Sequence, residues 1–525
     1  MTQANPPSGA QSADADKLDK GVLIVAGVVV LGAIMSILDV TVVSVALSTW
    51  EHEFNADTSD VAWTMTAYTL ALAMVIPMTG WAADRFGTKR LYLAAVVLFT
   101  IGSLLCSIAD SLNQLIAFRV VQGLGGGMLM PLGMTILTKA AGPHRVGRVM
   151  AVMGIPMLLG PIFGPILGGW MIDNLSWHWI FLINLPIGIG AVVYAWFALP
   201  KDHVEPSETF DFLGMVLLSP GLASLLYGVS SIPDAGTLWD TKVLTFMGIG
   251  TALIVAFIPW ALNTRNQHPL IDLRLFKNRN LTVSVIAMSF FAIAFFGASL
   301  LFPLFFQEVQ GFSATGSGGM LAPQGIGAMI TMPIAGLLVD RIGPGKIVMT
   351  GATVVALGMA MFTRVGADTD KPYVWASLFV MGLGMGGTMM PIMTAALATL
   401  VEHTIARGST LMNIIQQVAS SIGAAVFSVL LTNEFKDNDL LAAATAIEEA
   451  GGEQADPTVL AGILQKFGIT PDQLTPDNIL DALAGGFQDT FTVAVVLVGV
   501  VLIPAFFLPR KRLEQAPDPT LLAGH

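Results

Sequence analysis

Long apolar runs alternate with short polar segments along the whole chain. Each long run exceeds the about 18 residues that an α-helix needs to cross the hydrocarbon core of a bilayer. The pattern therefore predicts an all-α integral membrane protein with fourteen transmembrane helices. The predicted helices span residues 22–47, 61–83, 91–109, 112–138, 149–172, 178–199, 212–230, 243–262, 281–305, 317–338, 347–365, 373–400, 408–432 and 487–509.

Composition agrees with this class of protein. Hydrophobic residues make up 54% of the 525 residues and charged residues only 12%, whereas a soluble protein carries about 25% charged residues. The net charge of −11, without a basic tract, argues against nucleic acid as a partner. The sequence contains no nucleotide-binding, metal-binding or nucleophile motif, so we do not expect an enzyme. The single cysteine, Cys106, lies in an apolar run and is interpreted as a packing residue.

The basic residues are distributed unequally between the two sides of the predicted membrane. An even number of helices puts both termini on one side, and most of the 25 lysines and arginines then lie on that side. Because basic loops favour the cytoplasm, we expect both termini to be cytoplasmic. Residues 1–20 are polar, lack the apolar core of a signal peptide and are predicted to be a disordered tail; residues 510–525 form a second cytoplasmic tail.

One predicted extracytoplasmic loop is long. Residues 433–486 carry ten acidic side chains and two lysines. The stretches LLAAATAIEEA and DNILDALAGG within it have the composition of short surface helices. This loop is interpreted either as a solvated cap or as a functional element, namely a lid or a docking site for a partner.

Two turns of the chain repeat one pattern. GWAADRFGTKR at 80–90 follows the second predicted helix and GLLVDRIGPGK at 336–346 follows the tenth, with G, D, R and G at the same offsets. Such a repeat indicates two related halves. Eight helices separate the matches, whereas two six-helix halves alone require six, so two helices are inserted between the halves. The predicted parts are a six-helix bundle at 21–200, two linker helices within 201–279 and a second six-helix bundle at 280–509.

Five motifs occur in order at the expected helices. They carry a resemblance to the fourteen-helix drug:proton antiporters of the major facilitator superfamily, the EmrB/QacA-like group. The resemblance covers nearly the whole chain, although His178 stands where arginine is common in the last motif. The motifs are LDVTVVSVAL (38–47), GWAADRFGTKR (80–90), LIAFRVVQGLGGG (115–127), GPIFGPILGG (160–169) and WHWIFLINLPIG (177–188).

The resemblance implies a secondary active exporter in the cytoplasmic (inner) membrane of a bacterium. Such a protein moves amphiphilic small molecules, cationic or neutral, out of the cytoplasm or the inner leaflet by alternating access, in exchange for protons. The proton gradient is then the energy source, and no cofactor is required. Membrane lipids surround the protein, and a membrane-fusion protein is a candidate partner because some relatives in double-membrane bacteria use one.

Two opposite charges interrupt apolar helices at similar depth. A charge near the centre of a membrane helix costs about 2.5–3.5 kcal/mol, so the presence of Asp39 and Arg119 needs a reason. Asp39 lies eight residues before the predicted outer end of the helix at 22–47, and Arg119 lies seven residues into the helix at 112–138. At about 1.5 Å per residue both lie about 10–12 Å below the outer ends. We therefore expect them to share a polar cavity and to pair, directly or through water.

A paired carboxylate suits proton coupling, because binding a proton changes its attraction for the neighbouring cation. We predict that Asp39 is the main proton site and a contact for cationic drugs, with Arg119 modulating it. The alternative is an ion pair that only stabilises the fold. Other candidate cavity residues are polar, aromatic or polarizable side chains, each of which alternatively contacts lipid or a neighbouring helix. They are Met35, Trp63, Tyr68, Gln122, Gln324, Asn413, Gln416 and Gln417.

The fifth predicted helix is a candidate for conformational change. Gly160, Gly164 and Gly168 share one face, which lets a neighbouring backbone approach closely. Pro161 removes a backbone donor and bends the helix. A bent, closely packed helix suits a rocking interface, and ordinary membrane packing is the alternative.

The two repeated turns are the other candidates for conformational change. Gly87 permits a tight turn, and the basic side chains are expected to face water and anionic lipid. The resemblance implies that Asp84 braces the inward-closed state against the N-terminus of a helix in the other half, beginning near Ser409, with Asp340 as its repeat. A helix N-terminus attracts a carboxylate, and charge that only directs membrane insertion is the alternative. The turn residues are Gly80, Asp84, Arg85, Gly87, Lys89 and Arg90 in the first turn and Asp340 and Arg341 in the second.

Two other functions compete with drug export. One is the dedicated export of a single endogenous lipid, pigment or antibiotic. The other is a transport-inactive membrane sensor or scaffold that uses the acidic outer loop as its binding face. Asp39 and Arg119 disfavour the sensor, because a scaffold does not need buried charges.

Overall fold

The computed structural model describes residues 20–142, 145–202, 209–235, 237, 239–266, 268–401, 404–450 and 457–511. Within these ranges the regular structure is helical and no β-strand occurs, which confirms the predicted all-α class. Apart from residues 20, 510 and 511, the two predicted tails lie outside the described residues.

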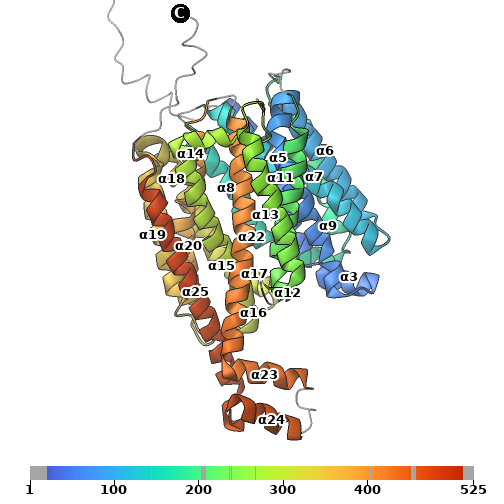
Figure 1. The fold of residues 1–525 in the computed structure, drawn as a ribbon, viewed down its shortest axis with the longest axis vertical. Coiled ribbons are helices and arrows are strands. Elements are labelled where there is room, and N and C mark those ends of the chain that lie inside the picture. The colour runs from blue at the N-terminus through green and yellow to red at the C-terminus, as the bar shows by residue number, and fades with distance from the viewer. Residues whose placement is uncertain are drawn as a thin grey trace, which may run out of the picture.

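Long helices run side by side between two ends of the molecule (Figure 1). Among the described residues, thirteen helices are long and apolar enough to cross a membrane. α8, Val146–Asn174, has 29 residues and stands at the place of the predicted fifth span, but it is not one of the thirteen. The number of fourteen therefore stays a prediction. The other long elements are α2 Lys20–Val43, α5 Trp63–Phe86, α6 Thr88–Ser107, α7 Leu112–Ala141, α9 Trp179–Leu182 followed by α10 Asn184–Ala198, α11 Phe212–Ser230, α13 Thr241–Leu262, α14 Arg279–Phe291 continued by the π-helix η2 Ala292–Phe296, α15 Gly297–Ser299 and α16 Leu301–Glu308, α17 Ala314–Met320 followed by α18 Ala322–Ile342, α19 Pro344–Phe362, α20 Lys371–Gly386 followed by α21 Met389–Leu397, α22 Ile405–Asp437 and α25 Pro476–Phe506.

Three helix ends differ most from the prediction. The run at 22–47 is broken by a turn after Val43, and a separate short helix, α3, spans Leu47–Phe54. In contrast, α22 and α25 continue beyond the apolar runs, so that DNILDALAGG belongs to α25 and is not a helix of its own. Hydropathy identifies only the part of a helix that lipid or protein covers. It does not detect a turn between apolar residues, and it does not detect a helix that continues into water.

Two short helices project from one end of the bundle (Figure 1). They are α23, Asp439–Glu449, which contains most of LLAAATAIEEA, and α24, Pro457–Phe467. We name this the acidic end, after the predicted loop that forms it. The opposite end, where α5 turns into α6 and α18 turns into α19, is the basic end.

The first repeated turn is held by a residue that follows α10. Gly87 has φ +92°, as expected for a tight turn that favours glycine. Asp202 accepts hydrogen bonds from the backbone N–H groups of Lys89 and Arg90 over 2.7 and 3.1 Å and so caps α6. Nζ of Lys89 donates to the carbonyl of Leu199 over 2.7 Å, at the C-terminal end of α10. The ammonium group of Lys89 thus contacts the end of α10, and the side chain of Arg90 is 76% exposed. That the basic side chains of this turn face water and anionic lipid stays a prediction.

Replacing Asp202 by alanine is expected to lower the free energy of unfolding by about 1–3 kcal/mol, because two helix N–H groups lose their acceptor. Thermal unfolding of the purified protein in detergent measures the loss. Asp173→Ala, at an exposed position near the end of α8, is the matched control. Equal stability of the two variants would refute the capping role.

The inserted helices pack beside the junction of the predicted halves. α13 lies against α11, where Ser224 donates to the carbonyl of Phe246 over 2.8 Å. α11 in turn contacts both α5 and α22. The buried carboxylate of Asp211 joins α11 to α13, because it accepts from N–H of Gly214 at the start of α11 and from Nε1 of Trp260 in α13, over 2.8 and 2.7 Å. The division into six, two and six helices stays a prediction.

Candidate functional site

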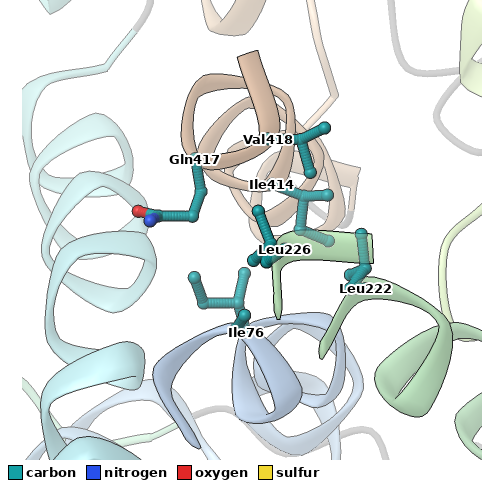
Figure 2. A pocket seen from close by; sticks show the side chains of 7 residues that line it. Ile76, Leu222, Leu226, Ile414, Gln417 and Val418 are labelled. Atoms are coloured by element: carbon teal, nitrogen blue, oxygen red, sulfur yellow. The ribbon is translucent and has the colours of Figure 1, made fainter. Parts of the chain in front are cut away.

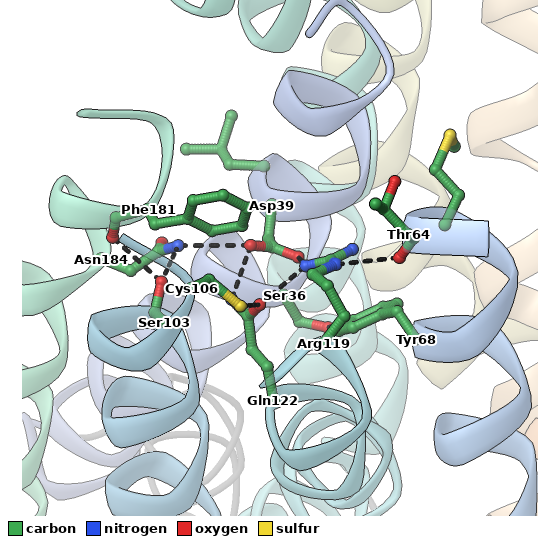
Figure 3. Close-up of polar contacts among 12 residues, drawn as sticks. Ser36, Asp39, Thr64, Tyr68, Ser103, Cys106, Arg119, Gln122, Phe181 and Asn184 are labelled. Atoms are coloured by element: carbon green, nitrogen blue, oxygen red, sulfur yellow. Dashed lines mark hydrogen bonds and ion pairs between the residues drawn. The ribbon is translucent and has the colours of Figure 1, made fainter. Parts of the chain in front are cut away.

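An ion pair joins α2 to α7 inside the bundle (Figure 3). The side chains of Asp39 and Arg119 are almost fully buried, and Nη1 of Arg119 lies 2.5 Å from Oδ2 of Asp39. Gln122 closes the network: its Nε2 donates to Oδ1 of Asp39 over 2.7 Å, and its Oε1 accepts from Nη1 of Arg119 over 2.7 Å. Nε of Arg119 donates to the carbonyl of Thr64 over 3.1 Å. The two charges predicted to pair are thus in direct contact.

The helix end used to estimate the depth of Asp39 is wrong, although the pairing is present. α2 ends at Val43, so Asp39 lies four residues from the helix end and not eight. α7 begins at Leu112, as predicted. A count of residues is a coarse measure of depth, because helices in a membrane bundle are commonly tilted.

Aromatic rings surround the guanidinium group. The ring centroids of Tyr68 and Phe181 lie 4.1 and 5.8 Å from Cζ of Arg119. The hydroxyl groups of Tyr68 and Ser36 are 3.4 Å apart, and Trp50 stacks on the far side of the cluster against Phe181 at 5.9 Å. Rings stabilise a cation through their negative faces and exclude water, which strengthens the attraction between Asp39 and Arg119.

Three polar residues outside the predicted set of site residues complete the network. Nδ2 of Asn184 lies 3.4 Å from Oδ1 of Asp39 and donates to Oγ of Ser103 over 3.0 Å. Sγ of Cys106, expected only to pack, is buried and lies 3.6 Å from Oε1 of Gln122. Each is a polar side chain that interrupts an apolar run. Asp39 was identified by a similar interruption, so the same signal could have found Asn184.

The candidate cavity residues do not gather around one point. Tyr68 and Gln122 contact the ion pair, and Met35 on α2 is fully buried in the core. Trp63 is 40% exposed and stacks on Tyr227 of α11 at 5.4 Å. Trp63, at the start of α5, therefore packs against the inserted helix α11.

The candidates on the second half lie on α18 and α22. Nδ2 of Asn413 is buried, donates to the carbonyl of Ser409 over 2.9 Å and lies 3.4 Å from Sδ of Met134 on α7. Gln324 on α18 and Gln416 on α22 are half-buried. Asn413 thus contributes to the contact between α22 and α7.

A small pocket lies between α5, α11 and α22 (Figure 2). Gln417 is the polar member of its lining, and the other lining residues are apolar. The pocket therefore touches both predicted halves and an inserted helix. The lining residues are Ala73, Ile76, Leu222, Leu226, Ile414, Gln417 and Val418.

At the basic end, each repeated turn meets the first turn of a helix from the other predicted half. Oδ1 of Asp340 accepts from the backbone N–H of Gly147 over 2.9 Å, and Oδ2 lies 3.5 Å from Nε of Arg148, at the start of α8. Oδ2 of Asp84 lies 3.5 Å from Nε of Arg407, in the first turn of α22. This helix begins at Ile405, earlier than the predicted start near Ser409.

Glycines in the same turns allow the close approach. A Cβ on Gly80 would lie 3.2 Å from Oγ1 of Thr410, and a Cβ on Gly336 would lie 2.6 Å from the carbonyl oxygen of Gly147. Arg85 is half-buried, whereas Arg341 is exposed. The two repeats thus make matching contacts across the basic end.

The glycines of α8 face α2. A side chain on Gly160, Gly164 or Gly168 would meet Ile37, Thr41 or Val42 respectively. The expected close approach of a neighbouring helix is therefore present, and its role in conformational change stays a prediction. Pro161 lies within the same helix.

The long apolar helices define a multi-pass α-helical membrane protein with a charged pair buried in its bundle. The family model of the Major Facilitator Superfamily matches residues 29–424. The chain belongs to the major facilitator superfamily, and the predicted resemblance to its EmrB-like group is confirmed.

Relatives with known names extend this assignment. The chain is 47% identical over 532 residues to the multidrug resistance protein B homolog of Mycobacterium tuberculosis strain H37Rv, covering 100% of this chain and 96% of the relative. It is 31% identical over 437 residues to the multidrug export protein EmrB of Escherichia coli K12, covering 82% and 83%.

Solved structures show the same fold at low sequence identity. A double-tryptophan mutant of the xylose transporter XylE aligns with a TM-score of 0.59 at 13% identity, over 94% of this chain and 97% of that one. The human organic anion transporter MFSD10 (TETRAN) aligns with a TM-score of 0.57 at 14% identity, over 91% and 99%.

Proposed function

We propose that this chain is a proton-coupled exporter of amphiphilic small molecules, cationic or neutral, that works by alternating access. The observation that carries the proposal is the buried pair of Asp39 and Arg119 in a member of a transporter superfamily. The names of the relatives, multidrug resistance protein B homolog and multidrug export protein EmrB, support the class of substrate. The proton gradient is the energy source, and no cofactor takes part.

Proton binding at Asp39 changes the contact between α2 and α7. The ionised carboxylate attracts Arg119, whereas a protonated carboxyl group loses that charge and gains a donor. The pair then holds the two helices less strongly, so protonation favours a different arrangement of the bundle. A cationic substrate competes with the proton for the same negative charge, which favours exchange over cotransport.

The contacts at the basic end close one side of the transport path in this mechanism. Asp84 and Asp340 hold the first turns of α22 and α8 in the other predicted half. Separation of these contacts opens the basic end, and the glycine face of α8 permits its movement along α2. We assign the basic end and both termini to the cytoplasm, in the cytoplasmic membrane of a bacterium, because of the excess of basic residues.

Transport by purified protein in liposomes tests the proposal. With an imposed pH gradient, wild type is expected to move ethidium, and Asp39→Asn is expected to reduce the gradient-driven rate about tenfold or more. Asp110→Asn, at an exposed position before α7, is the matched control and should transport normally. Gradient-driven movement that survives in Asp39→Asn would refute Asp39 as the coupling site. If folded wild type moves neither ethidium nor neutral dyes, the exporter proposal itself fails.

A further inference from the structure

A second polar chain reaches Asp39 from the side opposite Arg119 (Figure 3). We infer that Asn184 is a positioning residue for Asp39: held by Ser103, it keeps an N–H donor directed at the carboxylate and thereby opposes protonation. This inference rests on the proposed role of Asp39 as the proton site. It adds a second influence on the protonation of Asp39, one that does not act through Arg119.

Four helices bring these groups together. Asn184 is the first residue of α10 and is 2% exposed. Its Nδ2 lies 3.4 Å from Oδ1 of Asp39 on α2 and 3.0 Å from Oγ of Ser103 on α6. Oγ of Ser103 donates to the carbonyl of Phe181 over 2.9 Å, so the chain of bonds ends in the short helix α9 that precedes α10.

The direction of this chain follows from its last member. The carbonyl of Phe181 only accepts, so Ser103 must donate its one hydroxyl hydrogen to it. Oγ of Ser103 then offers only lone pairs to Asn184, and the amide must turn its nitrogen toward Ser103. The same nitrogen faces Asp39, so its second N–H is directed at the carboxylate. A donor fixed in this way stabilises the ionised form.

The other contacts of the carboxylate point the same way. Gln122 donates to Oδ1 and Arg119 donates to Oδ2 of Asp39. A proton on Asp39 needs an acceptor in place of one of these donors. Rotation of the Asn184 amide supplies its carbonyl oxygen, but this rotation breaks the bond to Ser103. Protonation of Asp39 on the side that faces Asn184 therefore requires loss of the hydrogen bond between Asn184 and the hydroxyl of Ser103.

The titratable groups around Asp39 are distinct from this chain. They are Tyr68 on α5, Cys106 on α6 and Arg119 on α7. The hydroxyl of Tyr68 faces Ser36, and the thiol of Cys106 faces Gln122. Asn184 is a neutral group, so changing it alters the hydrogen bonds of Asp39 without adding or removing a charge.

An infrared titration of purified protein in lipid nanodiscs tests the inference without requiring transport. The carboxyl band that is missing from Asp39→Asn identifies Asp39. Asn184→Leu removes the donor at similar side-chain volume. It is expected to move the titration midpoint of this band to higher pH by about half to one unit. A full-strength hydrogen bond would give a larger shift, but Nδ2 of Asn184 and Oδ1 of Asp39 are 3.4 Å apart. Ser103→Ala should also move the titration midpoint to higher pH, by a smaller amount than Asn184→Leu. Asn174→Leu, at the exposed end of α8, should leave it unchanged.

Unchanged midpoints in both Asn184→Leu and Ser103→Ala, or shifts to lower pH, would overturn the inference. If Asn184→Leu does not fold, Ser103→Ala alone decides, because the amide remains and only its orientation is released. Wild type that titrates normally but moves no dye would count against the proposed exporter and not against this inference. The pH profile of ethidium transport should shift in the same direction as the infrared midpoint.

Discussion

Arg119→Met is expected to lower the free energy of unfolding by about 3–5 kcal/mol, or to prevent accumulation of folded protein. The reason is that Asp39 would remain as a buried carboxylate without its cation, and an unpaired buried charge costs more than the intact pair contributes. Gln122 and Asn184 would still donate to it, but neutral donors compensate a full charge only in part.

The double variant Asp39→Leu with Arg119→Met separates this effect from general damage. It leaves no buried charge, so we expect it to recover most of the stability that Arg119→Met loses, although not transport. Thermal unfolding in detergent compares wild type, the single variants Asp39→Leu and Arg119→Met, and the double variant. Arg90→Met, at a side chain that is 76% exposed, is the control and should be nearly neutral. A double variant as unstable as the sum of the two single losses would show that the charges do not depend on each other.

The second large effect is expected at the basic end. Removing the charges of Asp84 and Asp340 together, by replacement with asparagine, should open this end of the bundle. Each carboxylate lies at the first turn of a helix and near an arginine, and partly buried contacts of this kind contribute up to about 2 kcal/mol each. Their combined loss shifts the ratio of open to closed molecules by about ten- to a thousandfold.

Labelling of an engineered cysteine measures this opening. Thr410→Cys, in a background with Cys106→Ser, places a thiol at a position that is 1% exposed and faces Gly80. A water-soluble maleimide should react faster in the double asparagine variant than in its parent. Asp477→Asn with Asp481→Asn, at exposed positions of α25 near the acidic end, is the matched control. Equal labelling rates in both double variants would exclude a closing role for the two carboxylates.

The pairing of Asp39 with Arg119 could be predicted because apolar surroundings leave two opposite charges few other partners. The matching contacts of Asp84 and Asp340 were anticipated from the repeat and the resemblance. The position of Lys89 could not be predicted from its own segment, because its partners belong to α10, more than 100 residues away. A basic residue in a turn looks the same in sequence whether it faces water or caps a distant helix.

The partners of Asn184 were missed for a related reason. The residue is visible as a polar interruption of WHWIFLINLPIG, but its contacts with Asp39 and Ser103 depend on how α10 packs against α2 and α6. Hydropathy likewise placed the span at 22–47 but not the turn after Val43. Apolar patterning thus predicts which segments are helices, whereas contacts between segments decide where polar side chains are directed.

The projecting helices α23 and α24 have a practical consequence for imaging. A transporter whose mass lies almost wholly within a detergent belt offers few landmarks for aligning single particles. These two helices extend from one end of the bundle only (Figure 1) and present exposed side chains such as Val459, which is 47% exposed. An antibody fragment raised against them would mark one end of each particle without covering α2, α7 or α10, and the same reagent would report on intact cells which end faces outward.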